Sequence, residues 1–454
     1  MNAVHEPARR TPLLGEADVV VLGGGPAGLA AAVSAARHGA RTVLVERYGF
    51  LGGMGTAGGV TNFAGLYGRR QGQVQLLVRG VVDELLARIE RLGGLNAPQD
   101  GMQGRIRVRS YDIPAYICAA DEMLVGAGVQ PVFHALAVGA VMEGPGRIDA
   151  LLLETREGRR ALRARVFIDA SGDGDLAHHA GVPWDYGDGT GSALYPSTMA
   201  RIGGVDAPHA LAAVGEFSAI DRLMQAASAR YRFGRRGAIL RPQKNPAEWR
   251  ANVTQLAAPD GRAANALDAA ELTQAELEGR RQIVEYLRFL RAEVPGFERA
   301  ELLALPAQVG VRESRRIHGD YMLTGEDVLS GARFADVIGL NGWPMEVHAE
   351  GRIDWAFARD ADNAYHHLPL RMLLPQGLDN LYVAGRCASM AHLGQAAARV
   401  SGPCFAMGQA AGTAAALSLT RGFDPRAPGA AAALQRVLRE DGADLDDPTP
   451  PPAP

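Results

Sequence analysis

The stretch from Ala17 to Glu46 constrains the fold more than any other part of the chain, because it reads as a complete β-turn-α-β unit. Val19 to Leu22 is a continuous apolar run, typical of a parallel strand that is buried on both faces. A helix is expected from Ala27 to His38, and a second strand from Arg41 to Val45. Such a unit places a helix N-terminus at the end of a buried strand, where its unpaired N–H groups favour an anion.

The turn between the first strand and the helix has the pattern GxGxxG. Gly23 permits a tight turn, Gly25 lets the backbone approach a pyrophosphate, and Gly28 lets the helix pack on the strand. Pro26 and Ala27 complete the expected phosphate loop. Glycine turns also serve purely structural roles, but a fingerprint flanked by both strands and the helix predicts dinucleotide binding.

Glu46 ends the second strand, 46 − 28 = 18 residues past the last of these glycines, where its carboxylate can accept hydrogen bonds from ribose hydroxyls. A glycine-dense stretch follows, which by composition alone resembles a flexible linker. A loop that leaves this strand lies against the bound nucleotide, however, and glycines let its backbone come close. The residues that we expect there are Arg47, Gly52, Gly53, Met54 and Thr56.

The length of 454 residues exceeds one compact core and predicts two domains, or one large domain with an insertion. A net charge of −3 provides no general attraction to nucleic acid or anionic membranes, so neither is expected as a partner. No apolar run reaches the roughly 18 residues of a membrane span, and the first residues lack the apolar core of a signal peptide. These features favour a cytoplasmic protein.

The three cysteines, Cys118, Cys387 and Cys404, are far apart and form no CxxC pair. This spacing argues against a disulfide-reducing flavoenzyme of the CxxC type and against a cysteine-based metal site. The side chains of adjacent histidines point in different directions, so no metal site is expected at His178-His179 or at His366-His367. No second glycine fingerprint is flanked by strand, helix and acid, which argues against a separate NAD(P)H domain.

Three strands are expected at Val138–Met142, Ile148–Glu154 and Ala161–Ile168, joined by glycine turns into a small meander. The third runs into the sequence IDASGDGD, from position 168 to position 175. Together with the N-terminal GxGxxG unit and a late NLYVAGR segment (380–386), this stretch resembles the FAD-dependent oxidoreductases of glutathione-reductase-like topology. The sequence is most similar to the bacterial FAD-dependent oxidoreductase group, which is distantly related to fumarate reductase flavoproteins.

The resemblance implies FAD as the cofactor. It implies contacts to FAD from Ala170, Ser171, Gly172 and Asp173, and from Gly385, Arg386, Arg399 and Gly402 near the C-terminus. Many related proteins have an acid where this chain has Arg386, so an arginine here suits the pyrophosphate or an acidic partner instead. The small-residue helix expected at Gly402–Leu419 could stabilise negative charge on the flavin with its N-terminus, or it could simply pack closely.

We therefore predict an α/β fold: a Rossmann-like three-layer FAD-binding domain, made of a parallel sheet, helices and the small β-meander, with an inserted α+β substrate domain. The expected organisation is a disordered tail (1–15), a discontinuous FAD-binding domain (16–190 and 376–425), the insertion (191–375), a C-terminal helix (426–440) and a disordered acidic, proline-rich tail (441–454).

Arg312 and Arg315 lie in the segment RESRRI, which also resembles this family. Two readings stay open. The arginines could form a structural ion-pair cluster with Glu313, Asp320 and Asp327, or one could enter the site and hold a carboxylate or phosphate through a bidentate pair.

His348 and His366 are the preferred acid/base candidates, and Tyr365 is a further one, because their segments resemble those that reach the flavin in related enzymes. Imidazole can exchange a proton near neutral pH while the flavin takes a hydride. A lone histidine is more often a satisfied structural group, so that alternative stays open for each.

The predicted function is that of an FAD-dependent oxidoreductase that transfers a hydride between a small polar, or anionic, molecule and flavin N5. One alternative is a redox-neutral hydratase or isomerase that keeps FAD for structure or electrostatics. Another is a flavin-bearing RNA-modifying or partner-binding protein, which would need a basic face extending from the cleft. A homo-oligomer is compatible with the sequence, which does not decide it.

Overall fold

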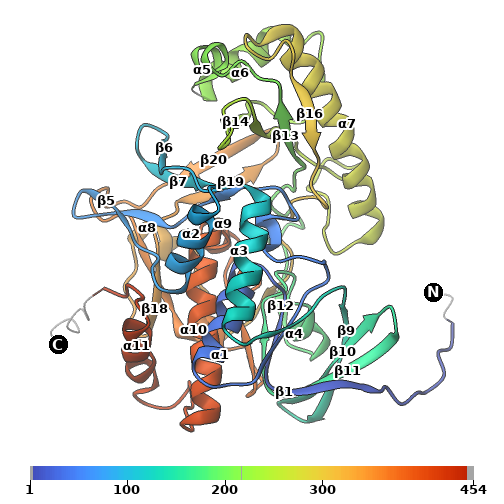
Figure 1. The fold of residues 1–454 in the computed structure, drawn as a ribbon, viewed down its shortest axis with the longest axis vertical. Coiled ribbons are helices and arrows are strands. Elements are labelled where there is room, and N and C mark those ends of the chain that lie inside the picture. Colours follow the sequence, from blue (N-terminus) through green and yellow to red (C-terminus); the bar gives the residue numbers. More distant parts are fainter. Residues whose placement is uncertain (1–3, 216, 447–454) are drawn as a thin grey trace.

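The computed structural model describes residues 4–215 and 217–446 (Figure 1). Helices α5, α6 and α7 and strands β13, β14 and β16 gather at one end of the molecule, and the sheet that contains β1 lies toward the other (Figure 1). Two large hydrophobic cores correspond to these two regions.

The main sheet is parallel at its centre, in the order β8, β2, β1, β11, β22. Its strands span Gln130–Val132, Thr42–Val45, Leu13–Leu22, Gly158–Asp169 and Leu381–Val383, respectively. The same sheet continues into an antiparallel part, because the first half of the long strand β11 pairs with β10 (Arg147–Thr155), which pairs with β9 (Leu136–Gly144). The predicted parallel sheet and β-meander are both confirmed, and β11 joins them.

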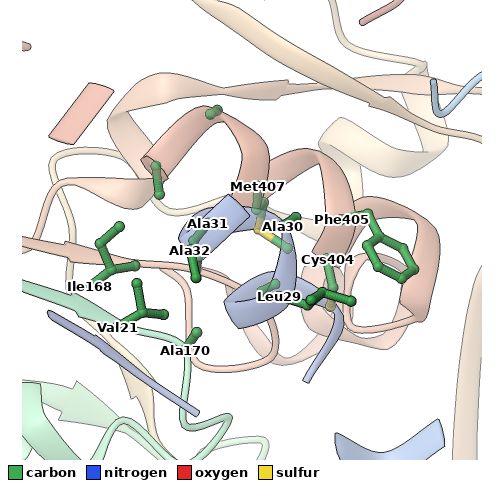
Figure 2. Close-up of a cluster of buried hydrophobic side chains, with 14 of the residues drawn as sticks. Val21, Leu29, Ala30, Ala31, Ala32, Ile168, Ala170, Cys404, Phe405 and Met407 are labelled. Carbon is green, nitrogen blue, oxygen red and sulfur yellow. The ribbon is translucent and has the colours of Figure 1, made fainter. Parts of the chain in front are cut away.

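Helix α1 (Pro26–Arg37) packs against α10 (Ser401–Thr420) unusually closely. A Cβ atom at Gly408 would lie 2.0 Å from the carbonyl oxygen of Ala27, and one at Gly412 would lie 2.1 Å from that of Ala31. Figure 2 shows the labelled alanines of α1 beside Met407, with side chains of the sheet nearby. Small residues in both helices therefore set the position of α1, whose N-terminus faces the end of β1.

The inserted region is α+β, as expected. Its antiparallel sheet has the order β14, β15, β13, β16, and its strands span Ile239–Pro242, Trp249–Asn252, Met199–Gly203 and Glu301–Ala304. Helices α5 (Ala207–Val214), α6 (Phe217–Ala227) and α7 (Ala269–Glu293) accompany it. The large buried side chains Trp249, Phe289 and Phe297 fill a core of its own.

The other strands form short pairs and one three-stranded sheet: β3 (Asn62–Phe63) with β7 (Ile106–Ser110) and β6 (Gln99–Gly101), β4 (Tyr67–Arg70) with β5 (Gln73–Leu76), β12 (Trp184–Asp185) with β17 (Arg316–Ile317), β18 (Val337–Asn341) with β21 (His366–Pro369), and β19 (Met345–Ala349) with β20 (Arg352–Ala356). The other helices are α2 (Val81–Arg91), α3 (Ile113–Gly126), α4 (Asp175–His179), α8 (Gly325–Ser330), α9 (His392–Ala398) and α11 (Ala430–Glu440).

Strands β18 and β21 differ from the predicted organisation, because their buried side chains belong to the core of the main sheet. Val337, Leu340 and Leu368 pack in that core, although they lie inside the 191–375 range expected for the insertion. The separate core of the inserted region runs only from Ala200 to Ala300. The chain therefore returns to the first core well before residue 375.

Three local expectations are wrong. The helical spacing of apolar residues from Gln73 to Leu92 predicts one helix, but α2 begins only at Val81, because Gly80 has a φ of +92°, outside the helical region. Residues 13–15, expected in a disordered tail, are the start of β1 and run beside β11. At the other end, Asp446 accepts hydrogen bonds from the Tyr365 hydroxyl (2.8 Å) and pairs with His367 Nε2 (3.0 Å), so 441–446 is ordered. Residues 1–3 and 447–454 of the two expected tails lie outside the described residues.

Candidate functional site

One open cleft of about 1820 Å³ runs from the glycine turn after β1 to the sheet of the inserted region. Its walls come from β1, α1, the loop after β2, the end of β11, strands β14, β15 and β19, and the segment before α10. Parts of the chain that are hundreds of residues apart thus share one cavity.

The glycine turn forms a tight cradle at one end of the cleft. Gly23 has a φ of +100°, and a Cβ atom there would lie 2.4 Å from the carbonyl oxygen of Ala170. A Cβ atom at Gly28 would lie 1.7 Å from the carbonyl oxygen of Gly23, so only glycine lets α1 start this close to the turn. Helix α1 has Gly25 as its N-cap, no side-chain cap and no acid in its first turn, which leaves its N-terminus suited to an anion.

Glu46 is buried beside this turn, at the end of β2. Its carboxylate accepts hydrogen bonds from the backbone N–H groups of Gly24 (2.7 Å) and Tyr48 (3.0 Å). A carboxylate has about four acceptor positions, so ribose hydroxyls can still bind to it. Gly53 approaches Gly25 from the following loop, where a Cβ atom at Gly53 would lie 2.8 Å from the Cα of Gly25.

Asp169 organises the loop after β11 rather than facing the cleft. It accepts hydrogen bonds from the N–H and hydroxyl groups of Ser171 (3.0 and 2.6 Å) and from the N–H group of Ala177 (2.9 Å). Burial raises the pKa of this carboxyl group, although these hydrogen bonds oppose the shift. The loop backbone at Ala170, Ser171 and Gly172 is thereby held against the cleft.

Arg386 pairs with Asp173 across this loop, at 2.9 Å, and also donates a hydrogen bond to the Ser314 hydroxyl, at 3.0 Å. Burial opposes ionisation of Asp173, but the charges of Arg386 and Arg47 outweigh it and lower the pKa of Asp173. Of the two roles considered for an arginine at position 386, the acidic partner is thus present in the fold.

The glycine cradle, the uncapped helix N-terminus and the carboxylate of Glu46 fit the pyrophosphate and ribose of a dinucleotide. The model of the family described as "FAD dependent oxidoreductase" matches residues 18–438 of the sequence. The chain belongs to this family of FAD-dependent oxidoreductases. FAD is therefore its cofactor, and the cleft residues described above are suited to hold the adenosine diphosphate part.

No curated protein sequence matches this FAD-dependent oxidoreductase. Among solved structures it is similar to a geranylgeranyl bacteriochlorophyll reductase-like protein from Thermoplasma acidophilum, with 12% identity, a TM-score of 0.46, and coverage of 94% of this chain and 84% of the other. It is also similar to p-nitrophenol 4-monooxygenase from Pseudomonas putida, with 12% identity, a TM-score of 0.45, and coverage of 96% and 91%. Within the described residues, no helix is long and apolar enough to cross a membrane.

Most residues expected at FAD line the cleft of the oxidoreductase: Gly23, Gly25, Pro26, Ala27, Glu46, Arg47, Gly53, Met54, Ala170, Ser171, Gly172, Gly385, Arg386 and Arg399. The other expected residues do not line the cleft but belong to the loops and helices that form its walls: Gly28, Gly52, Thr56, Asp173 and Gly402. Gly402, for example, permits close packing, since a Cβ atom there would lie 2.2 Å from the carbonyl oxygen of Gly65. The Thr56 hydroxyl donates to the carbonyl of Leu51, at 2.8 Å, within the loop after β2.

At the other end of the cleft, Glu346 and His348 form a buried pair. They lie two residues apart on β19, so both side chains project from the same face of the strand. His348 Nε2 lies 3.0 Å from Glu346 Oε1, and Trp343 Nε1 donates to Glu346 Oε2 at 3.2 Å.

The charges around this pair define its protonation. Burial opposes ionisation of Glu346, but His348 and the nearby arginines outweigh it and lower the pKa of Glu346 to about 2. Burial, together with the charge of Arg312, lowers the pKa of His348 well below its usual range. The pair therefore consists of a carboxylate and a neutral imidazole at neutral pH.

Arg312 lines this end of the cleft, and its Nη1 donates to the carbonyl of Tyr195 at 2.6 Å. Arg315 does not line it. Instead Arg315 pairs with Asp175 at 3.1 Å and lies over the ring of Trp184, which matches the structural ion-pair reading with a different acid. Burial and the neighbouring carboxylates raise the pKa of Asp175 to about 6, although Arg315 opposes this.

Tyr365 and His366 lie at a second cavity and not at the cleft. The Tyr365 hydroxyl donates to Asp446, and His366 Nε2 lies 3.4 Å from Asn341 Nδ2. Burial lowers the pKa of His366 to about 3. Because neither residue lines the cleft that contains the glycine turn, we remove both from the proposed catalytic set.

Several cleft residues were not anticipated from the sequence, chiefly Glu346, Arg241, Arg250 and the aromatic residues Tyr111, Trp343 and Trp355. Glu346 could have been predicted from the sequence, because it lies two residues before His348, in a segment expected to reach the flavin. Arg250 carried none, because an arginine within a strand of the inserted region belongs to no motif.

Proposed function

We propose that this protein transfers a hydride between a carbon atom of a small, polar, anionic substrate and N5 of the flavin. The observation that carries the proposal is that His348, Glu346 and Arg312 line the same cleft as the glycine turn and Glu46. Bound FAD supplies the redox chemistry, while the protein supplies position, charge and proton transfer.

His348 is the proposed acid/base. Because Glu346 is ionised, Nε2 of His348 carries the hydrogen that bridges to it at 3.0 Å, and Nδ1 keeps a lone pair. This lone pair can accept the proton that leaves the substrate when a hydride is removed, and the carboxylate of Glu346 then stabilises the imidazolium. In the reducing direction the same nitrogen returns the proton.

Arg312 is the proposed anchor for the anionic group. Its hydrogen bond to the Tyr195 carbonyl holds the guanidinium in place at the cleft wall, so little side-chain freedom is lost when an anion binds. An anion held there lies beside His348, the residue whose pKa Arg312 depresses.

The first test is spectroscopic. The purified protein should show the absorption bands of oxidised flavin, and an anaerobic screen of small acids should find one that bleaches the band near neutral pH. A protein that neither carries nor takes up FAD contradicts the proposal. Substrate turnover without any bleaching would instead support a redox-neutral reaction.

The second test is His348→Gln. We expect the rate of flavin reduction to fall by about a hundredfold or more while flavin content is unchanged, because a general acid/base contributes roughly that much. His209→Gln is the control, since His209 is an exposed histidine on α5 of the inserted region. An unchanged rate in His348→Gln would remove His348 from the reaction.

A further inference from the structure

Three arginines and one carboxylate meet at the far end of the cleft from the glycine turn. Arg250 comes from β15 of the inserted region, Arg312 precedes β17, and Arg399 follows α9. Arg250 and Arg312 are 4% and 7% exposed, respectively. Glu346 of β19 is the acid between them.

The arginines lack matching acids. Of these three arginines, only Arg399 is within ion-pair distance of Glu346, at 3.9 Å. Arg250 Nη1 donates to the carbonyl of Val60, and Arg312 Nη1 to that of Tyr195, both at 2.6 Å. Among the described residues, neither of these two arginines forms an ion pair, and Nε of Arg250 and of Arg399 has no hydrogen-bond partner.

The formal charges of Arg250, Arg312, Arg399 and Glu346 therefore sum to +3 − 1 = +2. Burial and neighbouring arginines lower the pKa of Arg250 to about 9 and lower that of Arg312 strongly. Guanidinium groups nevertheless stay protonated at neutral pH, and buried charges without counter-charges are unfavourable. The pyrophosphate of FAD is assigned to the glycine turn and oxidised isoalloxazine is neutral, so the cofactor does not supply the missing negative charge at these arginines.

An apolar wall faces the same space. Ile106, Val108 and Trp343 form a small buried cluster that also lines the cleft, and Trp355 packs on it, with a ring-centroid distance of 5.9 Å to Trp343. A purely polar ligand would leave this wall without a partner.

We infer that the substrate combines at least two negative charges, held by Arg250, Arg312 and Arg399, with an apolar body of about ring size that packs on the wall around Trp343. This inference rests on the proposed function and specifies its substrate class. The site forms between the two regions of the fold, because Arg250 belongs to the inserted sheet while Arg399 leads into α10. Burial of the arginines suits a small molecule and not a polynucleotide backbone.

The test uses the FAD-loaded protein and a set of small ligands that share a ring but differ in charge. Phthalate and phenyl phosphate are dianions, benzoate is a monoanion and benzamide is neutral; succinate is a dianion without a ring. Binding is followed by the change in the flavin spectrum at fixed ionic strength and pH 7.5. We expect at least one ring dianion to bind about tenfold or more tightly than benzoate, and more tightly than succinate. Comparing the affinities for phthalate and phenyl phosphate distinguishes a dicarboxylate site from a phosphate ester site.

Two variants locate the effect. Arg250→Gln and Arg312→Gln should each lose most of the preference for dianions, while Arg288→Gln, an exposed arginine on α7, should keep it. The variants come from different regions of the fold, so either one suffices if the other fails to fold. Equal binding of mono- and dianions by the unchanged protein overturns the inference, as does a preference that persists in both variants. Failure of the proposed function would appear separately, as absent FAD or absent bleaching.

Discussion

Replacing Glu346 by glutamine tests the electrostatics of the cleft most directly. Glu346 is 9% exposed and accepts a hydrogen bond from Trp343 while it bridges to His348. Glutamine keeps the shape and can still accept the indole hydrogen bond, but it removes the negative charge beside Arg250, Arg312 and Arg399. Any loss of stability in Glu346→Gln therefore measures the contribution of the carboxylate charge and not that of side-chain packing.

The magnitude follows from the pKa of Glu346, which lies at about 2 against an ordinary value of 4.5. One pKa unit corresponds to about 1.4 kcal/mol, so the ionised carboxylate contributes about 3 kcal/mol to folding at pH 7. The folded-state pKa is the lower one, so this stability is fully present above the unfolded-state pKa. It is lost as pH falls through the folded-state value, and about 1.4 kcal/mol of it remains at pH 3.

The assay is urea unfolding of the original protein and Glu346→Gln between pH 7 and pH 3, with the control variant Glu143→Gln, whose side chain is 64% exposed. The free energy of unfolding should fall by about 3 kcal/mol in Glu346→Gln at pH 7, with the difference narrowing toward acid pH, and the control should stay within about 0.5 kcal/mol. A difference that is the same at pH 7 and pH 3 would refute the reasoning, because it would show that packing and not charge was lost.

Three further predictions concern the cradle and the C-terminus. In thermal melts, Gly28→Ala should lower stability by about 3 kcal/mol, and it should abolish flavin binding, because its Cβ would lie 1.7 Å from a backbone oxygen. The control Gly126→Ala, at the end of α3, should be neutral or slightly stabilising in the same melts, because no atom lies within 4 Å of its Cβ. Glu46→Gln should weaken FAD binding about tenfold in a flavin-release titration, through loss of charge-assisted hydrogen bonds to the ribose, and unchanged affinity would count against that role. Asp446→Ala should lower the free energy of unfolding by about 1 to 2 kcal/mol with full flavin content, since its hydrogen bond to Tyr365 lies outside the cleft; altered flavin reduction would contradict our removal of Tyr365 from the catalytic set.

The nucleotide end of the cleft could be predicted because it is local. Gly23, Gly25 and Glu46 lie within one β-turn-α-β unit, so backbone geometry over some 24 residues (46 − 23 + 1) places all three. The meander strands and α10 were likewise predictable, because alternating apolar and polar residues indicate half-buried strands and a long run of small residues indicates a closely packed helix. The helical spacing of apolar residues before α2 predicts a helix that is too long at its N-terminus, because Gly80 interrupts it.

The part of the cleft around His348 could be predicted only in part. Glu346 and His348 share a strand, and the spacing of two residues alone puts them on one face. Tyr365 and His366 looked equivalent in the sequence, but pairing of β21 with β18 places them at a different cavity.

By itself, then, the sequence determined the nucleotide-binding unit, because Gly23, Gly25 and Glu46 lie near one another in the chain, and its resemblance to a known family indicated FAD. The charge of the cleft around Glu346 was decided only by tertiary structure. Arg250 and Arg312 are 312 − 250 = 62 residues apart, in regions with separate cores, and they meet beside Glu346 only where the inserted sheet closes over the first domain. Arginine is common on surfaces, so nothing in the sequence distinguishes these buried arginines from exposed ones until the fold removes them from water.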